Sequence, residues 1–305
     1  MTGAHDLSPA RIAAAVERID SPFLHTPQFV SDELSAAAKR EVVIKNETLT
    51  PIGSFKGRGT WLLAEWLDPA RTWVCSTAGN FGQGLAYAAR ARGATVEAFV
   101  STDVPSAKVA AMRALGAHVH TCEQPDRSAR DHAGTTDDRL LVVDGLRPEM
   151  AEGAGTIGLE LDASGPMDLA IVQIGDGALI SGVACWLKAA RPRTRIVGVC
   201  ASGAPAMARS YVAGRLITTP STNTIATAIA ISEPIPESLA RVTALVDEIV
   251  LVDDDDLRHA QKLILGTLNV SVEPAGAAGV AALVRHGARL PPGRTALILT
   301  GAGAA

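Results

Sequence analysis

The 305-residue sequence has little of several features that would narrow its function at once. Aromatic residues make up only 4% of the chain, and 28 Lys and Arg stand against 32 Asp and Glu. There is thus no positive excess to neutralise nucleic-acid phosphates, which argues against a nucleic-acid binder. No apolar run reaches the roughly 18 residues that a membrane-spanning helix requires. The first 19 residues are charged and lack a secretory pattern, so we expect a cytoplasmic protein.

Cysteine and lysine are also scarce. The cysteines form no C-x-x-C pair and have no His at metal-ligand spacing, so we expect buried, reduced thiols at Cys75, Cys122, Cys185 and Cys200. Any lysine chemistry has only six candidates, which are Lys39, Lys45, Lys56, Lys108, Lys188 and Lys262.

The residues that are present predict an ordinary α/β protein. Hydrophobic residues make up 47% of the chain and the net charge is −4, which argues against long disorder. Short β-branched runs alternate with longer Ala-rich stretches and mostly lack strict polar alternation, which is typical of parallel strands covered on both faces. The chain shows no repeat or linker, so two lobes packed together are expected. The predicted strands are 42–45, 73–77, 96–100, 117–122, 140–143, 169–174, 196–200, 248–252 and 295–300.

Several helix boundaries can also be predicted. Ser8 before Pro9 is a helix start, and Pro105 opens a helix that Gly116 closes. The acidic run 253–256 favours a helix N-terminus, where acids complement the dipole, over a metal site.

The loop at residues 50–60, TPIGSFKGRGT, is the first of four that could carry chemistry. Pro51 and Gly53 favour a turn, Ser54 could cap the following helix, and Lys56 falls in its first turn. The positive end of the helix dipole would lower the pKa of Lys56 and favour the neutral amine that a Schiff base requires. The alternative is a surface lysine near a helix start.

The second loop follows a predicted strand with the sequence STAGNFGQG. Backbone N–H groups and the hydroxyls of Ser76 and Thr77 could bind a carboxylate at the helix start, and Asn80 adds a neutral donor and acceptor. The alternative is a turn that uses Gly79 and Asn80 for backbone reasons alone.

The other two loops are a glycine loop and a C-terminal pair. Gly175 and Gly177 lie between an apolar strand and a helix, as in a phosphate-binding turn, although the full G-x-G-x-x-G pattern is absent. Glu273 precedes Pro274 at a helix start, and Thr300 places a hydroxyl at the end of the last strand. Alone, each of these features is equally compatible with ordinary turns and caps.

Taken together and in this order, the motifs resemble the fold-type II pyridoxal-phosphate enzymes, specifically the threonine/serine dehydratase and serine racemase family. The resemblance extends over nearly the whole chain and rests on HTP (25–27), KNETLTPIGSFKGRG (45–59), the Asn loop, PSAKVAAMRALGAHV (105–119), the glycine loop, VEPAG and LTG. It implies two lobes of mainly parallel sheet, as in the tryptophan synthase β subunit. The large, cofactor-binding domain would be 1–68 with 148–305, and the small domain 69–147.

The resemblance also implies roles for individual residues. Lys56 would bond pyridoxal phosphate covalently and take the substrate Cα proton. The cofactor would be held by Phe55, Lys56, Asn80, Gly175, Asp176, Gly177, Ala178, Leu179, Glu273 and Thr300, with Asn80 at the 3-hydroxyl, residues 175–179 at the phosphate and Thr300 at the ring nitrogen. The substrate would lie against Ser76, Thr77, Ala78, Gly79, Asn80 and Phe81.

Departures from the family pattern bear on the substrate. Racemases of this family carry a serine where this chain has Ala78, which argues against racemisation. Phe81 stands where the dehydratase pattern usually has His. This replacement could be a packing change under the helix, or it could reflect a substrate of different shape. Asp176 interrupts the glycine loop, and we expect its side chain to turn away from the phosphate. Thr227 lies in a segment that is closer to threonine synthase-like relatives.

The sequence therefore predicts a lyase that converts L-threonine, L-serine or a close β-hydroxy amino acid to a 2-oxo acid and ammonia. The alternatives are a β- or γ-replacement enzyme, as in cysteine synthase or threonine synthase relatives, and a pyridoxal-phosphate-binding protein without catalysis. The segment 201–208 lacks the acids that bind a metal in some relatives, so no metal is expected. We also expect no C-terminal regulatory domain, no nucleic-acid or membrane partner, and a homodimer or homotetramer.

Overall fold

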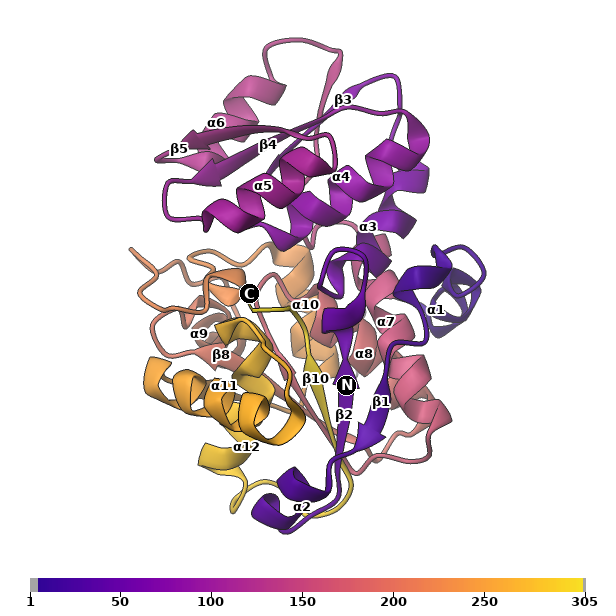
Figure 1. The fold of residues 1–305 in the computed structure, drawn as a ribbon, viewed down its shortest axis with the longest axis vertical. Helices are drawn as coiled ribbons and strands as arrows, with labels where there is room; N and C mark the ends of the chain where they lie inside the picture. The colour runs from indigo at the N-terminus through magenta and orange to yellow at the C-terminus, as the bar shows by residue number, and fades with distance from the viewer. Residues whose placement is uncertain (1–4, 304–305) are drawn as a thin grey trace.

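The computed structural model describes residues 5–303 as two lobes, each built on its own sheet (Figure 1). The larger sheet has the strand order β1-β2-β10-β7-β8-β9, and the smaller has the order β5-β4-β3-β6. The strands are β1 (Gln28–Val30), β2 (Val42–Asn46), β3 (Thr72–Ser76), β4 (Val96–Ser101), β5 (His118–Cys122), β6 (Arg139–Leu141), β7 (Leu169–Gln173), β8 (Arg195–Ala201), β9 (Glu248–Val252) and β10 (Thr295–Leu299).

The pairing of the strands confirms the expected α/β fold with mainly parallel sheets. Strand β1 pairs with β2 in the antiparallel direction, and the other paired strands run parallel. All nine predicted strands are present within a residue or two of their expected bounds, and β1 was not predicted.

Helices cover both faces of each sheet. In the larger lobe α7 and α8 pack together on one face and α11 and α12 on the other, while in the smaller lobe α6 lies opposite α4 and α5. The α-helices are α1 (Pro9–Ala15), α2 (Asp32–Ala38), α3 (Lys56–Leu63), α4 (Asn80–Arg92), α5 (Ser106–Ala114), α6 (Pro125–Ala133), α7 (Pro148–Ala163), α8 (Ala178–Ala190), α9 (Ala206–Ala213), α10 (Pro236–Leu245), α11 (Asp254–Leu268) and α12 (Ala278–His286). Short 3₁₀ turns are η1 (Ser21–Phe23), η2 (Glu47–Leu49), η3 (Ala64–Trp66), η4 (Thr227–Ile229) and η5 (Pro274–Ala277).

The predicted helix boundaries are largely confirmed. The hydroxyl of Ser8 caps α1, and Gly116 follows the end of α5 with a φ of +96°. The side chain of Asp253 accepts a hydrogen bond from the Asp256 N–H in a capping box at the start of α11. The expected cap from Ser54 is wrong, because α3 begins at Lys56 with Phe55 at the N-cap position and no side-chain cap.

Glycines let helices α3, α7 and α8 approach one another closely. A Cβ atom added to Gly182 of α8 would lie 1.8 Å from the carbonyl oxygen of Ala151 in α7. One added to Gly153 of α7 would lie 2.6 Å from the carbonyl oxygen of Arg58 in α3. The first helix of the candidate site is therefore fixed by direct backbone packing.

A buried network of charged side chains joins β2, η2, α3 and α7. Arg58 is fully buried and lies 2.9 Å from Glu47 and 2.6 Å from Glu160, whose other oxygen is 2.5 Å from Lys45 Nζ. Burial alone would raise the pKa of Glu160, but the hydrogen bonds and charges of Arg58 and Lys45 lower it to about 2.

The cysteines are free thiols, and Cys75, Cys185 and Cys200 are buried as expected, whereas Cys122 is half-buried. No helix within residues 5–303 is long and apolar enough to cross a membrane.

Candidate active site

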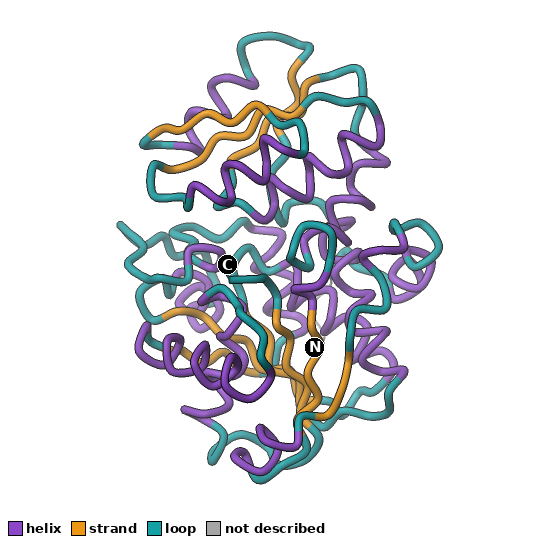
Figure 2. The backbone as a smooth tube through the Cα atoms, in the orientation of Figure 1, coloured by secondary structure: helices purple, strands orange, loops and turns teal. Residues whose placement is uncertain are grey.

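A cavity of about 910 Å³ lies between the two lobes and gathers nearly all the residues singled out in the sequence. Loops that follow β3, β7 and β10 line it, as expected for an open α/β sheet. Figure 2 shows loop segments, in teal, between the two lobes. Its lining includes Phe55, Lys56, Ser76, Thr77, Ala78, Gly79, Asn80, Phe81, Gly175, Asp176, Gly177, Leu179, Glu273 and Thr300. Of the predicted site residues only Ala178 does not line it, because its side chain is buried in the core.

Lys56 is the buried cation of this cavity. Its Nζ lies 2.6 Å from Asp144 Oδ2 and 2.6 Å from Asp176 Oδ2. Burial alone would lower the pKa of Lys56, but the two carboxylates outweigh burial and raise the pKa above its ordinary value. The expected lowering by the helix dipole is therefore wrong in this arrangement, because two adjacent negative charges exceed a partial positive one.

The two carboxylates beside Lys56 are not equivalent. Burial and the neighbouring charge of Asp176 raise the pKa of Asp144 to about 7. For Asp176, burial is outweighed by Lys56 and by the hydrogen bond from the Ala178 N–H (2.7 Å), and its pKa is lowered. The pair therefore holds its negative charge preferentially on Asp176.

The orientation of Asp176 corrects an expectation. Its side chain was expected to turn away from the glycine loop, but it lines the cavity and bonds both Lys56 and the start of α8. The cause is local, because a carboxylate at a helix N-terminus finds an unpaired N–H group.

The glycine loop itself has the geometry of an anion cradle. Gly177 adopts a φ of +97°, which favours glycine, and it is the N-cap residue of α8. A Cβ atom on Gly175 would lie 2.9 Å from the carbonyl oxygen of Ala228. The N–H groups of the first turn of α8 lack helical carbonyl partners, and one of them is taken by Asp176.

The loop that carries Lys56 is tied to the end of β10. The Phe55 N–H donates to the carbonyl oxygen of Thr300 at 3.1 Å, and Ser54 forms an isolated bridge with Gly301. The Thr300 hydroxyl accepts a hydrogen bond from Gln173 Nε2 at 3.0 Å. Backbone hydrogen bonds therefore fix the position of the Lys56 loop relative to Thr300.

The Asn loop is ordered by the Thr77 hydroxyl, which accepts hydrogen bonds from the N–H groups of Gly79 and Gly82 at 2.9 and 3.0 Å. The amide of Asn80 donates to Glu273 Oε1 at 2.7 Å. The Nζ of Lys108, from α5, lies 2.6 Å from Glu273 Oε2. The carboxylate of Glu273, in the larger lobe, thus accepts hydrogen bonds from two side chains of the smaller lobe.

The three other departures from the family pattern, Ala78, Phe81 and Thr227, all line the cavity. Phe81 is 3% exposed and belongs to the larger apolar core, so it serves packing and cavity shape together. Thr227 opens the 3₁₀ turn η4 in the larger lobe.

Asp144, Lys108 and Gln173 were missed in the sequence. Asp144 follows a predicted strand and precedes Gly145, which is a signal that could have found it. Lys108 is one of six lysines and lies inside a quoted motif, but its partner is 165 residues away in the chain.

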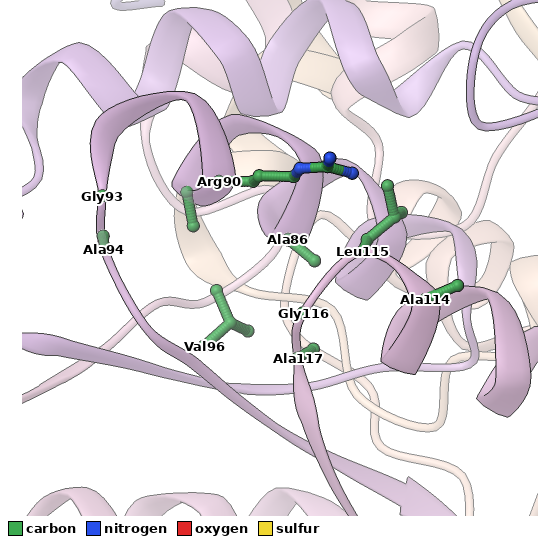
Figure 3. Close-up of a pocket in the computed structure, with 10 residues that line it drawn as sticks. Ala86, Arg90, Gly93, Ala94, Val96, Ala114, Leu115, Gly116 and Ala117 are labelled. Atoms are coloured by element: carbon green, nitrogen blue, oxygen red, sulfur yellow. The ribbon is translucent and has the colours of Figure 1, made fainter.

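A second hollow, of about 350 Å³, lies between the ends of α4 and α5 (Figure 3). Arg90 is the one charged residue among the ten that line it, and the others are small or apolar. It offers no acid–base pair and is a weaker candidate. Within residues 5–303, no three His, Cys, Asp or Glu side chains are grouped to hold a metal ion.

A lysine at a helix start, an adjacent anion cradle and a terminal-strand hydroxyl meet in this cavity, which is the arrangement that the sequence resemblance implies. A family model described as pyridoxal-phosphate dependent enzyme matches residues 19–301, and the chain belongs to this family. The protein is therefore a pyridoxal-phosphate-dependent enzyme, and the predicted family, fold type and cofactor are confirmed.

Individual relatives carry more specific names. The chain is 33% identical over 275 residues to a serine racemase of Oryza sativa subsp. indica, covering 86% of this chain and 79% of the relative. It is 30% identical over 301 residues to an L-threo-3-hydroxyaspartate ammonia-lyase of Pseudomonas sp., covering 95% and 93%. The solved structure of a threonine deaminase from T.th. is similar with a TM-score of 0.89 and 31% identity, covering 97% and 98%.

The residues present fit pyridoxal phosphate. Lys56 can bond the carbonyl, and the backbone of residues 175–179 leaves N–H groups at a helix N-terminus for the phosphate. Among residues 175–179, Asp176 disfavours phosphate binding, because its carboxylate and the phosphate are both anions at the same helix start.

Proposed function

We propose that the protein is a pyridoxal-phosphate-dependent ammonia-lyase that converts L-threonine, L-serine or a close β-hydroxy amino acid to a 2-oxo acid and ammonia. Relatives named as ammonia-lyases and dehydratases support the lyase class. Relatives named as serine racemases are slightly more similar, at 33% identity against 30–31% for these lyases. The observation that favours elimination over racemisation is Ala78, whose methyl group lines the cavity and cannot transfer a proton.

The main predicted residues each have a chemical task in this proposal. When bound, pyridoxal phosphate withdraws electrons from the substrate Cα and makes its proton acidic. Lys56, as the neutral amine, takes that proton. The Asn loop, ordered by Thr77, holds the substrate carboxylate with its N–H groups.

Apart from Lys56, Asp176 and Glu273, the residues expected to hold the cofactor act through neutral side chains and backbone groups. The glycine loop binds the phosphate, Asn80 bonds the 3-hydroxyl, and Thr300 meets the ring nitrogen with a hydroxyl. A neutral hydroxyl does not enforce a protonated ring, so the site suits a reaction in which the leaving group removes the electrons. Elimination of a β-hydroxyl is such a reaction.

The test begins with the purified protein and its visible absorbance, followed by a screen of β-substituted amino acids for 2-oxo acid and ammonia. Product from threonine or serine supports the proposal. Lys56→Ala is expected to lose the covalent cofactor absorbance and the activity. The matched control Lys262→Ala changes an exposed lysine of α11 and is expected to keep both. Turnover by a colourless Lys56→Ala protein would refute the assignment.

A β- or γ-replacement enzyme is the second candidate, favoured by the position of Thr227 on the cavity wall. Product formed only when a nucleophile is added would establish it and exclude the lyase. A cofactor-binding protein without catalysis would retain the absorbance and give no product with either set of substrates.

We further propose that the enzyme is a cytoplasmic homodimer or homotetramer that uses no metal, and that residues 69–147 form the small domain. Light scattering on the purified protein tests the assembly. Activity that survives a chelator supports the absence of a metal requirement.

A further inference from the structure

Asp144 is a carboxylate at the reaction site to which the proposed function gives no task. It lies in the loop after β6, and its Oδ2 is 2.6 Å from Lys56 Nζ. Its Oδ1 is buried and has no hydrogen-bond partner within residues 5–303, although the residue lines the cavity. That oxygen has no exposed surface, but the side chain as a whole is 24% exposed and lines the cavity, where a bound molecule can contact it.

The segment around Asp144 is held firmly in place. The carbonyl oxygen of Gly145 accepts hydrogen bonds from Arg241 Nη1 at 2.8 Å and Ser238 Oγ at 3.4 Å. Arg241 is 1% exposed and pairs in turn with Asp6 at 2.7 Å. Gly145 has a φ of +74°, a conformation that favours glycine.

The charges around Asp144 favour keeping a proton on it during turnover. It faces Lys56 from α3, Asp176 from the loop before α8, and the Cys75 thiol from β3. Once Lys56 has bonded the cofactor or become a neutral amine, two carboxylates share the site without their cation. Asp176 keeps the hydrogen bond from the Ala178 N–H, which stabilises its anion, so the proton remains on Asp144. The raised pKa of Asp144, about 7, agrees with this assignment.

We propose that Asp144 is the catalytic acid that protonates the departing β-hydroxyl, an inference that rests on the proposed function. The Cα–H bond breaks, its proton goes to Lys56, and its electron pair forms the Cα=Cβ bond. The Cβ–O bond breaks with its pair on oxygen, which takes the Asp144 proton and leaves as water. The direct Lys56–Asp144 contact then returns the proton taken from Cα to the Asp144 carboxylate.

The experiment compares leaving groups in Asp144→Asn, which keeps the shape of the side chain. Hydroxide must be protonated to leave, whereas chloride leaves without a proton. We expect kcat for serine to fall about 100-fold or more, while β-chloroalanine turnover stays within about threefold. The variant is also expected to keep the cofactor absorbance and to exchange the serine Cα–H for deuterium in heavy water. Asp103→Asn, which changes an exposed acid lining the same cavity, is the matched control and is expected to leave both rates unchanged.

The outcomes separate the two proposals. Equal losses with serine and β-chloroalanine, or no loss with either, would overturn the role of Asp144 while leaving the lyase intact. Loss of Cα–H exchange would also overturn it, since the acid acts after that step. A wild-type enzyme that turned over β-chloroalanine but no β-hydroxy amino acid would overturn the proposed function, and the role of Asp144 with it.

Discussion

At the scale of single residues, charge balance around one lysine controls the site. Lys56 is paired with two carboxylates, which favour its protonated form, whereas bonding a carbonyl requires the neutral amine. Cofactor binding therefore has to displace an ion pair, and Asp176 opposes it further as an anion beside the expected phosphate position.

Replacing Asp176 tests this balance. Asp176→Asn is expected to lower the dissociation constant for pyridoxal phosphate several-fold, because it removes one charge that stabilises the lysine cation and one that repels the phosphate. Absorbance titration of the cofactor-free protein measures this dissociation constant. The control is Asp126→Asn, which changes an exposed acid that lines the cavity from α6. Weaker binding by Asp176→Asn would show that the carboxylate helps to hold the cofactor.

The sequence could identify Lys56, the Asn loop and the glycine loop because each is a short local motif. It could not give the protonation state of Lys56, whose partners lie 88 and 120 residues away along the chain. Asp144 has a local signal, since it follows a predicted strand and precedes Gly145, but its contact with Lys56 comes from the fold. Repulsion by a phosphate predicted that the Asp176 side chain would turn away from the glycine loop. In the structure it turns toward the cavity, because Lys56 and the Ala178 N–H attract it.

At the scale of helices and strands, a buried ion network and close glycine contacts position α3. The network of Lys45, Glu47, Arg58 and Glu160 is arranged so that each charge has a partner. Removing one partner from such a network leaves an unpaired buried charge, which is strongly destabilising.

The lowered pKa of Glu160 predicts how stability depends on pH. The folded-state pKa of about 2 lies below the ordinary value of 4.5, so the stabilisation is present above about pH 4.5 and is lost as pH falls toward 2. A shift of this size corresponds to about 3 kcal/mol. Urea unfolding between pH 3 and 7 is expected to show this loss. Glu160→Gln is expected to be less stable at pH 7 and to depend less on pH; an unchanged pH dependence would contradict the assignment.

The helix contacts predict opposite effects for two glycine substitutions. Gly182→Ala is expected to destabilise by about 1–3 kcal/mol, because its Cβ would lie 1.8 Å from the Ala151 carbonyl oxygen and force α7 and α8 apart. Gly266→Ala, at an exposed site in α11 with nothing within 4 Å of the added Cβ, is expected to stabilise by about 0.5–1 kcal/mol. Chemical denaturation measures both, and a neutral Gly182→Ala would mean that the helices can separate freely.

Regular elements were the part of the fold that the sequence predicted best. Strands such as β7 and β8 are continuous apolar runs buried on both faces, which leaves a clear signal. Strand β1 has three residues, two of them exposed, and no such run. The Ser54 cap failed because tertiary bridging to Gly301 determines how the chain enters α3.

At the scale of the whole molecule, Glu273 is a link between the lobes. Its two oxygens receive Asn80 and Lys108, both from helices that pack on the smaller sheet. The charge of Lys108 and the amide of Asn80 therefore favour an approach of the smaller lobe toward the larger one.

Removing this link is expected to loosen the lobes. Glu273→Ala should raise KM for the amino acid and leave the melting temperature nearly unchanged, because Glu273 belongs to none of the apolar core clusters. Faster amide hydrogen exchange in residues 79–83, at the start of α4, is also expected and can be measured by mass spectrometry. Glu248→Ala, a half-buried acid of β9 that lies outside the cavity lining, is the control. Unchanged exchange in Glu273→Ala would show that the contact does not hold the lobes together.

The attachment of the Lys56 loop to the end of β10 bears on the lifetime of the bound cofactor. Lys56, the glycine loop and Thr300 all belong to the six-stranded lobe, and bridges from Ser54 to Gly301 and from Phe55 to Thr300 join two of them directly. Of the residues expected to hold the cofactor, only Asn80 comes from the smaller lobe. Separation of the lobes would therefore open a path for amino acid and product while most cofactor contacts persist. Substrate exchange can then be rapid in an enzyme that rarely releases its cofactor.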